Sequence, residues 1–113
     1  MKFIYKIIPR VLWEDACKTG VFTGAPVDQA DGFIHFSTAL QIAETANKHF
    51  RGQKDLLLLR VPEDVFGKEL CYEISRNNAF FPHLYGELPV HLVQDVISFE
   101  SDKYGLFSFT ELK

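Results

Sequence analysis

The chain of 113 residues lacks the features that define several protein classes. It has only two cysteines, Cys17 and Cys71, and neither has a second Cys or His at a metal-ligand spacing. A disulfide framework or a closed zinc site is therefore not expected. No apolar run approaches the roughly 18 residues that a membrane span requires. Lys6 and Arg10 interrupt the apolar N-terminal stretch and no small-residue cleavage site follows, so we expect no signal peptide, no membrane association and a cytoplasmic location.

An excess of positive charge is also absent. Fifteen Asp and Glu against twelve Lys and Arg give a net charge of −3, which argues against general nucleic-acid binding, since that requires a basic face. A single nucleotide held by a few local groups remains compatible with this charge. With 47% hydrophobic residues, 11 phenylalanines, and no repeats or linkers, residues 1–113 are expected to form one domain with a dense core, as a monomer or weak homodimer.

Well-known functional motifs are missing as well. The sequence contains no GxGxxG, GxxxxGK[ST], HExxH, GxSxG or CxxC pattern. These motifs mark dinucleotide folds, phosphate-binding loops, zinc proteases, serine hydrolases and thiol redox sites. Any chemistry must therefore come from isolated polar residues inside apolar segments.

Periodicity and turn residues predict an α+β fold that is rich in strands. A β-rich run at residues 3–8 stops at Pro9, which suits the first turn of a helix. This helix would end at Gly20. A loop over residues 24–32 then leads to a short strand at 33–36. We expect the buried stripe of the first helix to contain Val11, Leu12, Trp13 and Ala16.

The second main helix has the clearest start in the sequence. Thr38 with Gln41 fits a capping box, and Gly52 would end the helix. Its expected apolar face consists of Leu40, Ile42, Ala43, Ala46 and Phe50. Four consecutive leucines within residues 56–61 are typical of a central strand buried on both faces. Further along we expect a turn at 62–67, a strand at 70–74, a turn at Asn77 and Asn78, a short helix at 90–93, a strand at 95–99, and Phe107 and Phe109 packed at an edge.

His35 is the first candidate for chemistry, in the segment GFIHFST (residues 32–38). Because side chains alternate along a strand, His35 and Ser37 share one face. Both would lie just before a helix N-terminus, whose free N–H groups favour a phosphate or carboxylate. Ser37 and Thr38 are also ordinary helix-capping residues, and a lone His in an apolar strand is most often a hydrogen-bonded core residue.

His83 and Lys6 are the other candidates. His83 lies in FFPHLYG (residues 80–86), which is too apolar for a solvated loop, and Tyr85 adds a ring that could stack on a base or nicotinamide. Lys6 is a charge in the middle of an apolar strand, where leaving it unpaired would be unfavourable. The simplest alternative for Lys6 is an edge strand from which its ammonium reaches water.

Three segments together resemble a known family. GFIHFST before a helix, DLLLLRV (residues 55–61) and FPHLYGELP (residues 81–89) resemble the small bacterial domain-of-unknown-function family 952 (DUF952). The likeness runs from IYKIIPRVLWEDA (residues 4–16) to the strand around Val96.

That family is similar in turn to the ADP-ribosyltransferase superfamily, whose α+β fold binds NAD. The resemblance implies ADP-ribosyltransferase-like split β-sheets with two main helices near the N-terminus. It aligns Lys6, His35 and His83 with positions where many superfamily members carry a His, a Tyr or Ser, and a Glu. Three basic residues at those positions suit an anionic nucleotide better than arginine-directed ADP-ribosylation, and they leave the acceptor without its usual carboxylate.

The function that this resemblance implies is binding or processing of NAD, ADP-ribose or a related phosphorylated nucleotide. His35 would contact the ribose or nicotinamide, and His83 would act as acid/base or orient the acceptor. Lys6 would offset phosphate charge, and the N–H groups after Ser37 would hold a phosphate. Thr38 and Tyr85 complete the expected ligand-binding set. NAD would be a substrate, and no cofactor is assigned.

Other functional classes stay open. An enzyme of this type would be an NAD-utilising transferase or hydrolase, or a phosphotransferase, whereas loss of the glutamate also fits a non-catalytic nucleotide-binding module. A two-histidine phosphoesterase is a further alternative, because His35-Phe36-Ser37 matches one H-x-[ST] half-motif. The segments beginning at His83 and His91 lack the second hydroxyl residue. A metal site with His35 and His83 lacks a third ligand at a diagnostic spacing.

Overall fold

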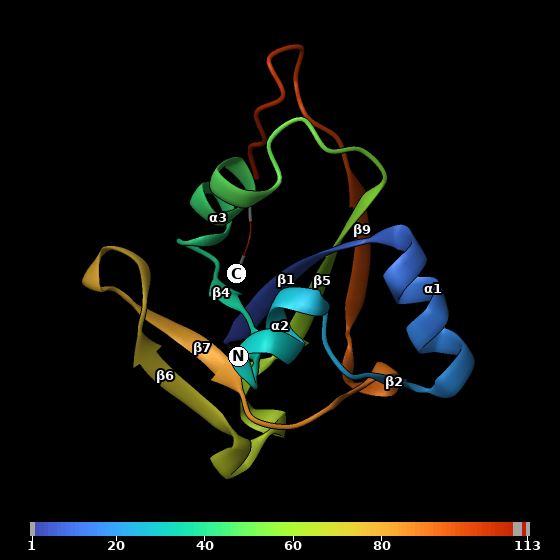
Figure 1. The fold of residues 1–113 in the computed structure, drawn as a ribbon, viewed down its shortest axis with the longest axis vertical. Helices are drawn as coiled ribbons and strands as arrows, with labels where there is room; N and C mark the ends of the chain where they lie inside the picture. The colour runs from blue at the N-terminus through green and yellow to red at the C-terminus, as the bar shows by residue number, and fades with distance from the viewer. Residues whose placement is uncertain (1, 110–111, 113) are drawn as a thin grey trace.

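The strands of the protein form three antiparallel sheets (Figure 1). The buried apolar side chains pack into two hydrophobic clusters. The computed structural model describes residues 2–109 and 112. The strands are β1 (Phe3–Pro9), β2 (Val21–Phe22), β3 (Ile34–His35), β4 (Ser37–Thr38), β5 (Leu56–Pro62), β6 (Leu70–Ile74), β7 (Phe80–Leu84), β8 (Leu88–Pro89) and β9 (Asp95–Phe99). The helices are α1 (Arg10–Thr19), α2 (Pro26–Asp31) and α3 (Ile42–His49), with 3₁₀ turns η1 (Glu63–Val65), η2 (Gly67–Glu69), η3 (Arg76–Asn78) and η4 (Val90–Leu92).

The main sheet has the order β4-β1-β5-β9, and its two inner strands are buried on both faces. Along β1, Ile4 and Ile8 enter one core while Phe3, Tyr5 and Ile7 enter the other. The leucines of β5 divide in the same alternating way, because successive side chains of a strand point to opposite faces. The α+β class and the central leucine-rich strand are therefore confirmed.

The second sheet, β3-β7-β6, sets the histidines side by side. His35 of β3 lies directly opposite His83 of β7, and His83 lies opposite Cys71 of β6. Directly opposed residues of antiparallel strands project to the same face. A third sheet pairs β2 with β8. Figure 1 shows the β6–β7 hairpin projecting from the main sheet on the side of α3, while α1 lies on the other side.

Most predicted elements are present, with small shifts in their boundaries. The first helix follows Pro9 and ends at Gly20, which adopts the left-handed conformation (φ 88°) that favours glycine. The expected strands at 70–74 and 95–99 match β6 and β9. Phe107 and Phe109 both pack edge-on against Phe99, as expected of the C-terminal aromatics.

Three predictions about local structure are wrong. Helix α3 begins at Ile42, because Gln41 folds its side chain back onto the Thr38 N–H (3.0 Å) in a separate turn. Leu40 consequently points into solvent and not into the core. The expected strand at 33–36 is reduced to β3 (Ile34–His35), and β4 (Ser37–Thr38), which follows it, belongs to a different sheet. Val11 on α1 is also exposed.

The structure also contains a helix that the sequence analysis assigned to a loop. α2 begins at Pro26 and is capped by Gly32, whose φ of 85° lies in the left-handed region that favours glycine. Its residue Asp28 meets Lys6 in the middle of β1, so α2 covers that part of the main sheet (Figure 1). Among the described residues, no helix is both long enough and apolar enough to cross a membrane.

The buried leucines of β5 provide a test of this core. Leu58 is 1% exposed, so Leu58→Ala should lower the free energy of unfolding by roughly 2–5 kcal/mol through lost burial and cavity formation. Urea denaturation measures the change. The matched control is Leu40→Ala, which removes the same atoms from a side chain that is 97% exposed and should change stability by less than about 0.5 kcal/mol. Similar losses in both variants would contradict the assigned core.

Candidate functional site

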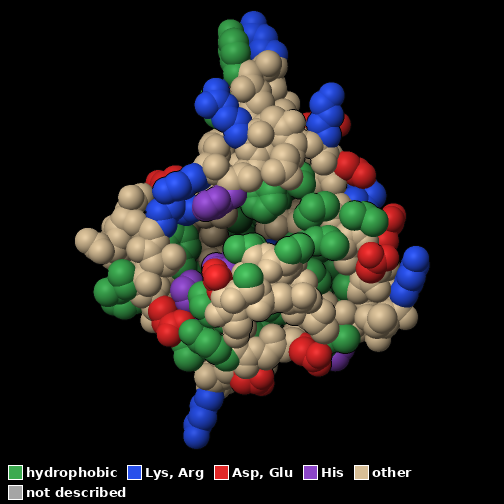
Figure 2. Space-filling model, viewed as in Figure 1, with side chains coloured by type: hydrophobic (Ala, Val, Ile, Leu, Met, Phe, Trp, Pro, Cys, Tyr) green, Lys and Arg blue, Asp and Glu red, His purple; other side chains and the backbone are tan. Residues whose placement is uncertain are grey.

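A cavity of about 640 Å³ lies between β1, α2 and β3 on one side and α3, η3 and β7 on the other. In Figure 2 a hollow opens near the middle of the visible face, bordered by histidine and by Lys or Arg side chains. The charged and titratable residues that line the cavity, tyrosine apart, are Lys6, Asp28, Asp31, His35, Lys48, His49, Arg76 and His83. A cavity of this size is in the usual range for small-molecule sites.

Asp28 organises one end of the cavity. It is 1% exposed, and its Oδ1 accepts hydrogen bonds from the Nδ1 (2.6 Å) and backbone N–H (3.1 Å) of His35. Its Oδ2 accepts from the Ala25 N–H at 2.7 Å. The Lys6 Nζ lies 3.2 Å from Oδ1 and 3.1 Å from Oδ2 and also donates to the His35 carbonyl at 2.8 Å. This set of contacts joins α2, β1 and β3 through one carboxylate.

The electrostatics of this end follow from burial and pairing. Burial by itself would raise the pKa of Asp28, but the hydrogen bond from His35, the charge of Lys6 and two backbone N–H groups outweigh it and lower the pKa to about 2. Burial lowers the pKa of Lys6, and the contact with Asp28 opposes that shift. The two charges therefore balance each other inside the protein.

The position of Lys6 corrects the edge-strand interpretation. β1 lies between β4 and β5, so it is an inner strand, and the Lys6 side chain is only 7% exposed. Its ammonium meets Asp28 and not water. The charge that the sequence analysis assigned to a ligand phosphate is thus already compensated by a carboxylate.

His35 is held between two carboxylates. Its Nδ1 meets Asp28, and its Nε2 lies 2.9 Å from Oδ2 of Asp31, the last residue of α2. Because an ionised carboxylate only accepts hydrogen bonds, a ring protonated on both nitrogens is needed to donate to both. Both ring nitrogens of His35 therefore already meet carboxylates at the β3 side of the cavity.

His83 lies opposite His35, and its ring has different neighbours from those of the His35 ring. Their ring centroids are 5.6 Å apart, and Phe33 stacks on the His83 ring at 4.1 Å. His83 is 4% exposed; its Nδ1 lies 2.9 Å from Oε1 of Glu73, whereas its Nε2 is buried and has no hydrogen-bond partner among the described residues. Nε2 of His83 is thus a buried polar atom whose hydrogen-bonding capacity is unused among the described residues.

Glu73 and Tyr85 form the outer support of His83. The Tyr85 hydroxyl donates to Oε1 of Glu73 at 2.6 Å, the same oxygen that meets His83. The hydrogen bond from Tyr85, followed by that from His83, lowers the pKa of Glu73, and the contact raises the pKa of Tyr85 to about 12. Since the carboxylate accepts, Nδ1 of His83 carries a proton.

The opposite end of the cavity is basic. Arg76 of η3 stacks on the ring of Phe81 (4.8 Å) and donates from Nη2 to Oγ1 of Thr45 at 2.8 Å. The Thr45 hydroxyl is also bonded to Oγ of Ser37 at 2.8 Å. Burial, together with the charges of Arg76, Lys48 and His35, lowers the pKa of His49 at this end. Arg76 and Lys48 therefore line this end of the cavity, where the nearest carboxylate to Arg76 is the exposed Glu44 (3.3 Å), which does not line it.

The structure brings together four of the six predicted site residues. Lys6, His35, Ser37 and His83 line the cavity. Thr38 does not, and its N–H is already bonded to the Gln41 side chain. The ring centroids of Tyr85 and Phe33 are 5.3 Å apart, but Tyr85 does not line the cavity, and its hydroxyl donates to Glu73.

Several residues of the site were missed by the sequence analysis. Asp28 and Asp31 were treated as loop and turn residues, although Pro26 followed by Asp28 and then Gly32 is a recognisable pattern for a short helix. Arg76 and Glu73 have no comparable sequence pattern. They reach the site only because the β6–β7 hairpin folds against α3 and β3.

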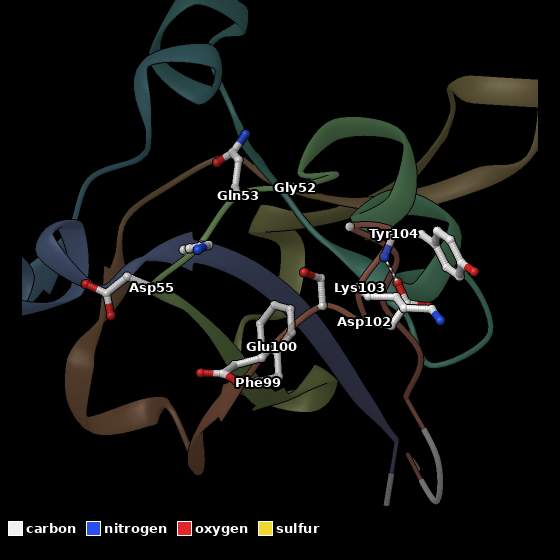
Figure 3. A pocket seen from close by; sticks show the side chains of 11 residues that line it. Gly52, Gln53, Asp55, Phe99, Glu100, Asp102, Lys103 and Tyr104 are labelled. Carbon is white, nitrogen blue, oxygen red and sulfur yellow. Dashed lines mark hydrogen bonds between the residues drawn. The ribbon is translucent and has the colours of Figure 1, made fainter.

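A second hollow, of about 680 Å³, lies at the other end of the main sheet (Figure 3). Its walls come from residues 52–55 and 99–105, including Asp55, Glu100 and Lys103. None of the predicted site residues contributes to it. Within residues 2–109 and 112, no three His, Cys, Asp or Glu side chains are grouped to hold a metal ion.

Fold and site define a small α+β protein with a histidine pair in a mixed-charge cavity. The chain belongs to the family described as Protein of unknown function (DUF952), whose model matches residues 7–96. This confirms the family expected from the sequence. The likeness to the ADP-ribosyltransferase superfamily stays a prediction.

Solved structures of a relative from Caulobacter crescentus have the same fold. The crystal structure of protein CC0527 from Caulobacter crescentus is 46% identical, with a TM-score of 0.90 over 92% of this chain and 91% of that chain. The solution NMR structure of CC0527 is also 46% identical, with a TM-score of 0.85 over 94% and 91% of the two chains. None of the curated proteins matches the chain.

The buried carboxylate predicts a specific acid sensitivity. Because the pKa of Asp28 falls from 3.8 to about 2 on folding, its contribution of about 2 kcal/mol is present above pH 4 and is lost as the pH falls towards 2. Asp28→Asn should remove this part of the pH dependence. It should also lower stability at pH 7 by roughly 3–5 kcal/mol, because Lys6 then stays buried without its charge partner.

Urea denaturation at several pH values measures both effects. The double variant Asp28→Asn/Lys6→Met is the control, since removing both charges should be less harmful than removing one. An Asp28→Asn variant with wild-type stability and an unchanged acid profile would disprove the role given to this carboxylate.

Glu73 should determine the tautomer of His83. In the wild type, neutral His83 should carry its proton on Nδ1, and Glu73→Ala should increase the population protonated on Nε2. Nitrogen-15 NMR shifts of the imidazole distinguish the two forms. Glu87→Ala, which removes an exposed carboxylate from the same hairpin region, is the control. Identical tautomer populations in wild type and Glu73→Ala would contradict the assignment.

Proposed function

We propose that the central cavity binds a small phosphorylated nucleotide, of the class of NAD and ADP-ribose, and that His35 and His83 transfer protons there. The observation that carries this proposal is the direct opposition of His35 and His83 across β3 and β7, with ring centroids 5.6 Å apart. Both residues were chosen from sequence alone, and both line one cavity. Two imidazoles at this spacing could serve as acid and base at neutral pH.

The cavity supports a ligand with an aromatic part and an anionic part. Phe36, Phe50 and Phe81 contribute apolar wall suited to a base or nicotinamide ring, while Arg76 and Lys48 contribute positive charge. This local charge contrasts with the net charge of −3 of the whole chain. An anionic ligand would be attracted to the cavity in preference to the rest of the surface.

We also propose that the resemblance to the ADP-ribosyltransferase superfamily is functional. The cavity is built where β1, β3 and β7 meet, the strands that carry Lys6, His35 and His83. No glutamate lines it among the described residues, and its carboxylates are Asp28 and Asp31. In hydrolysis of NAD, the bond from ribose to nicotinamide would break, water would add to the ribose carbon, and a histidine would accept the proton of that water.

A two-histidine phosphoesterase is the second candidate, and the same pair of rings favours it. His35 would act as the proton donor once its Nε2 leaves the half-exposed Asp31, and His83 would accept a proton at its unpaired Nε2 once water reaches that buried atom. In such a reaction His83 would take a proton from water as it attacks phosphorus. His35 would give a proton to the departing oxygen.

Proton NMR of the protein with NAD over several hours tests the main proposal. Binding should broaden the adenine and nicotinamide resonances, and chemistry should add peaks of free nicotinamide. His35→Ala and His83→Ala should each reduce nicotinamide release by roughly 10²–10⁴-fold, as expected for loss of a general acid or base. His91→Ala on η4, outside the cavity, should behave as the wild type.

Each other outcome has a defined meaning. Broadening without release would identify a binding module. Release that survives both histidine substitutions would refute the assigned roles. If NAD and ADP-ribose have no effect, a 2′,3′-cyclic nucleotide tests the phosphoesterase, and its histidine-dependent hydrolysis would replace the first candidate by the second.

A further inference from the structure

We propose that the end of the cavity between α3 and η3 is a phosphate-monoester subsite formed by Arg76, Lys48 and His49. None of these residues belongs to the site expected from the sequence. The inference rests on the proposed nucleotide binding. Within that function it favours nucleotides that carry a terminal phosphate monoester over NAD and ADP-ribose, whose two phosphates are both esterified. Inorganic phosphate should occupy the same place on its own.

The first argument is that Lys6, the lysine at the α2 end of the cavity, is already paired with Asp28. Lys6 is buried against both oxygens of Asp28 and the carbonyl of His35. Attracting a phosphate to Lys6 would bring that anion against a carboxylate that is 1% exposed. A second anion beside Asp28 is unfavourable, since like charges repel strongly where water is excluded.

The second argument is the state of the Arg76 guanidinium. Its side chain is 12% exposed, lies on Phe81 and is fixed by one hydrogen bond to Thr45. Its Nε is buried and has no hydrogen-bond partner among the described residues, although Oε1 of Glu44 is 3.3 Å away. A guanidinium has five N–H donors in one plane, so donors remain for a bidentate contact with phosphate.

The third argument is the grouping of cations around Arg76. Lys48 and His49 occupy the last turn of α3 and line the cavity with Arg76. Lys48 has no carboxylate partner among the described residues of the chain. The lowered pKa of His49 reflects burial and then the charges of Arg76, Lys48 and His35. A bound dianion would reverse the effect of those charges.

These features favour a monoester over a diester or a carboxylate. A phosphate monoester carries up to two negative charges at neutral pH, and Arg76 and Lys48 supply two cations. His49 could add a third when protonated. The Thr45 hydroxyl, which is bonded to the Ser37 hydroxyl, accepts from Arg76 and holds the guanidinium in place at the same end.

Three basic side chains act on the pKa of His49 from three elements of the cavity wall. Arg76 faces it from η3, Lys48 from its own helix, and His35 from β3. The remaining titratable groups of the wall, tyrosine apart, are Lys6 on β1, Asp28 and Asp31 on α2, and His83 on β7. Phosphate bound beside Arg76 should therefore raise the pKa of His49, whereas phosphate bound elsewhere should not.

The test is NMR titration of the histidine ring signals with inorganic phosphate, AMP and adenosine. We expect phosphate and AMP to shift His49 and raise its pKa, and AMP to bind at least tenfold more tightly than adenosine. Arg76→Lys, which keeps the charge but loses the planar donors, and Lys48→Gln, at an exposed position, should each weaken AMP binding about tenfold. Lys18→Gln on α1, which removes one exposed charge outside the cavity, is the matched control.

The outcomes separate this inference from the proposed function. If AMP and adenosine bind equally and shift His35 and His83 regardless of Arg76, the nucleotide function stands and the phosphate subsite is refuted. If phosphate binds in an Arg76-dependent way but no nucleotide shifts His35 or His83, the subsite stands and the nucleotide function is refuted. Absence of any shift with phosphate in the wild type would overturn the subsite.

Discussion

The buried contact of Asp28 with Lys6 and His35 is the interaction on which the cavity depends. A single carboxylate fixes the position of α2 over β1 and holds the ring of His35 at the end of β3. Burying these charges is unfavourable unless each has partners, and the structure provides them through side chains and the N–H groups of Ala25 and His35. The same contacts explain why Lys6 is tolerated inside an apolar strand. The stability of the fold and the position of the His35 ring are thus coupled through one residue.

The register of the strands, and not the Asp28 contact, determines where His83 lies relative to His35. The pairing of β3 with β7 places His83 directly opposite His35, and the pairing of β7 with β6 brings Glu73 to the Nδ1 side of His83. A shift of one residue in either pairing would move His83 to the opposite face of its sheet. The two histidines therefore have different partners although they are neighbours. One is held by two carboxylates, and the other has a buried ring nitrogen without a hydrogen-bond partner in the described part of the chain.

Much of the fold was predictable because its main elements have strong local patterns. Four leucines bounded by polar residues indicated β5, and Pro9 with Gly20 delimited α1. The start of α3 was not predictable from the Thr38–Gln41 pattern, since the same residues formed a separate turn before the helix. For the site, His35 and His83 could be chosen as polar residues in apolar segments. Arg76 could not, because its place in the cavity depends on the long-range packing of η3 against α3.

The distribution of charge within the cavity bears most directly on the kind of ligand. At the α2 end the carboxylates of Asp28 and Asp31 meet the ammonium of Lys6 and both ring nitrogens of His35. At the α3 end, Arg76 has only the exposed Glu44 nearby, and that residue does not line the cavity. A ligand with one anionic end would consequently have a single favourable orientation. Its charge would lie at Arg76, and its uncharged part would extend along the phenylalanines towards the histidine pair. Basic side chains line both the α2 end and the α3 end of the cavity, whereas the carboxylates that line it, Asp28 and Asp31, both lie at the α2 end. The difference in charge between the two ends therefore arises from the positions of the carboxylates.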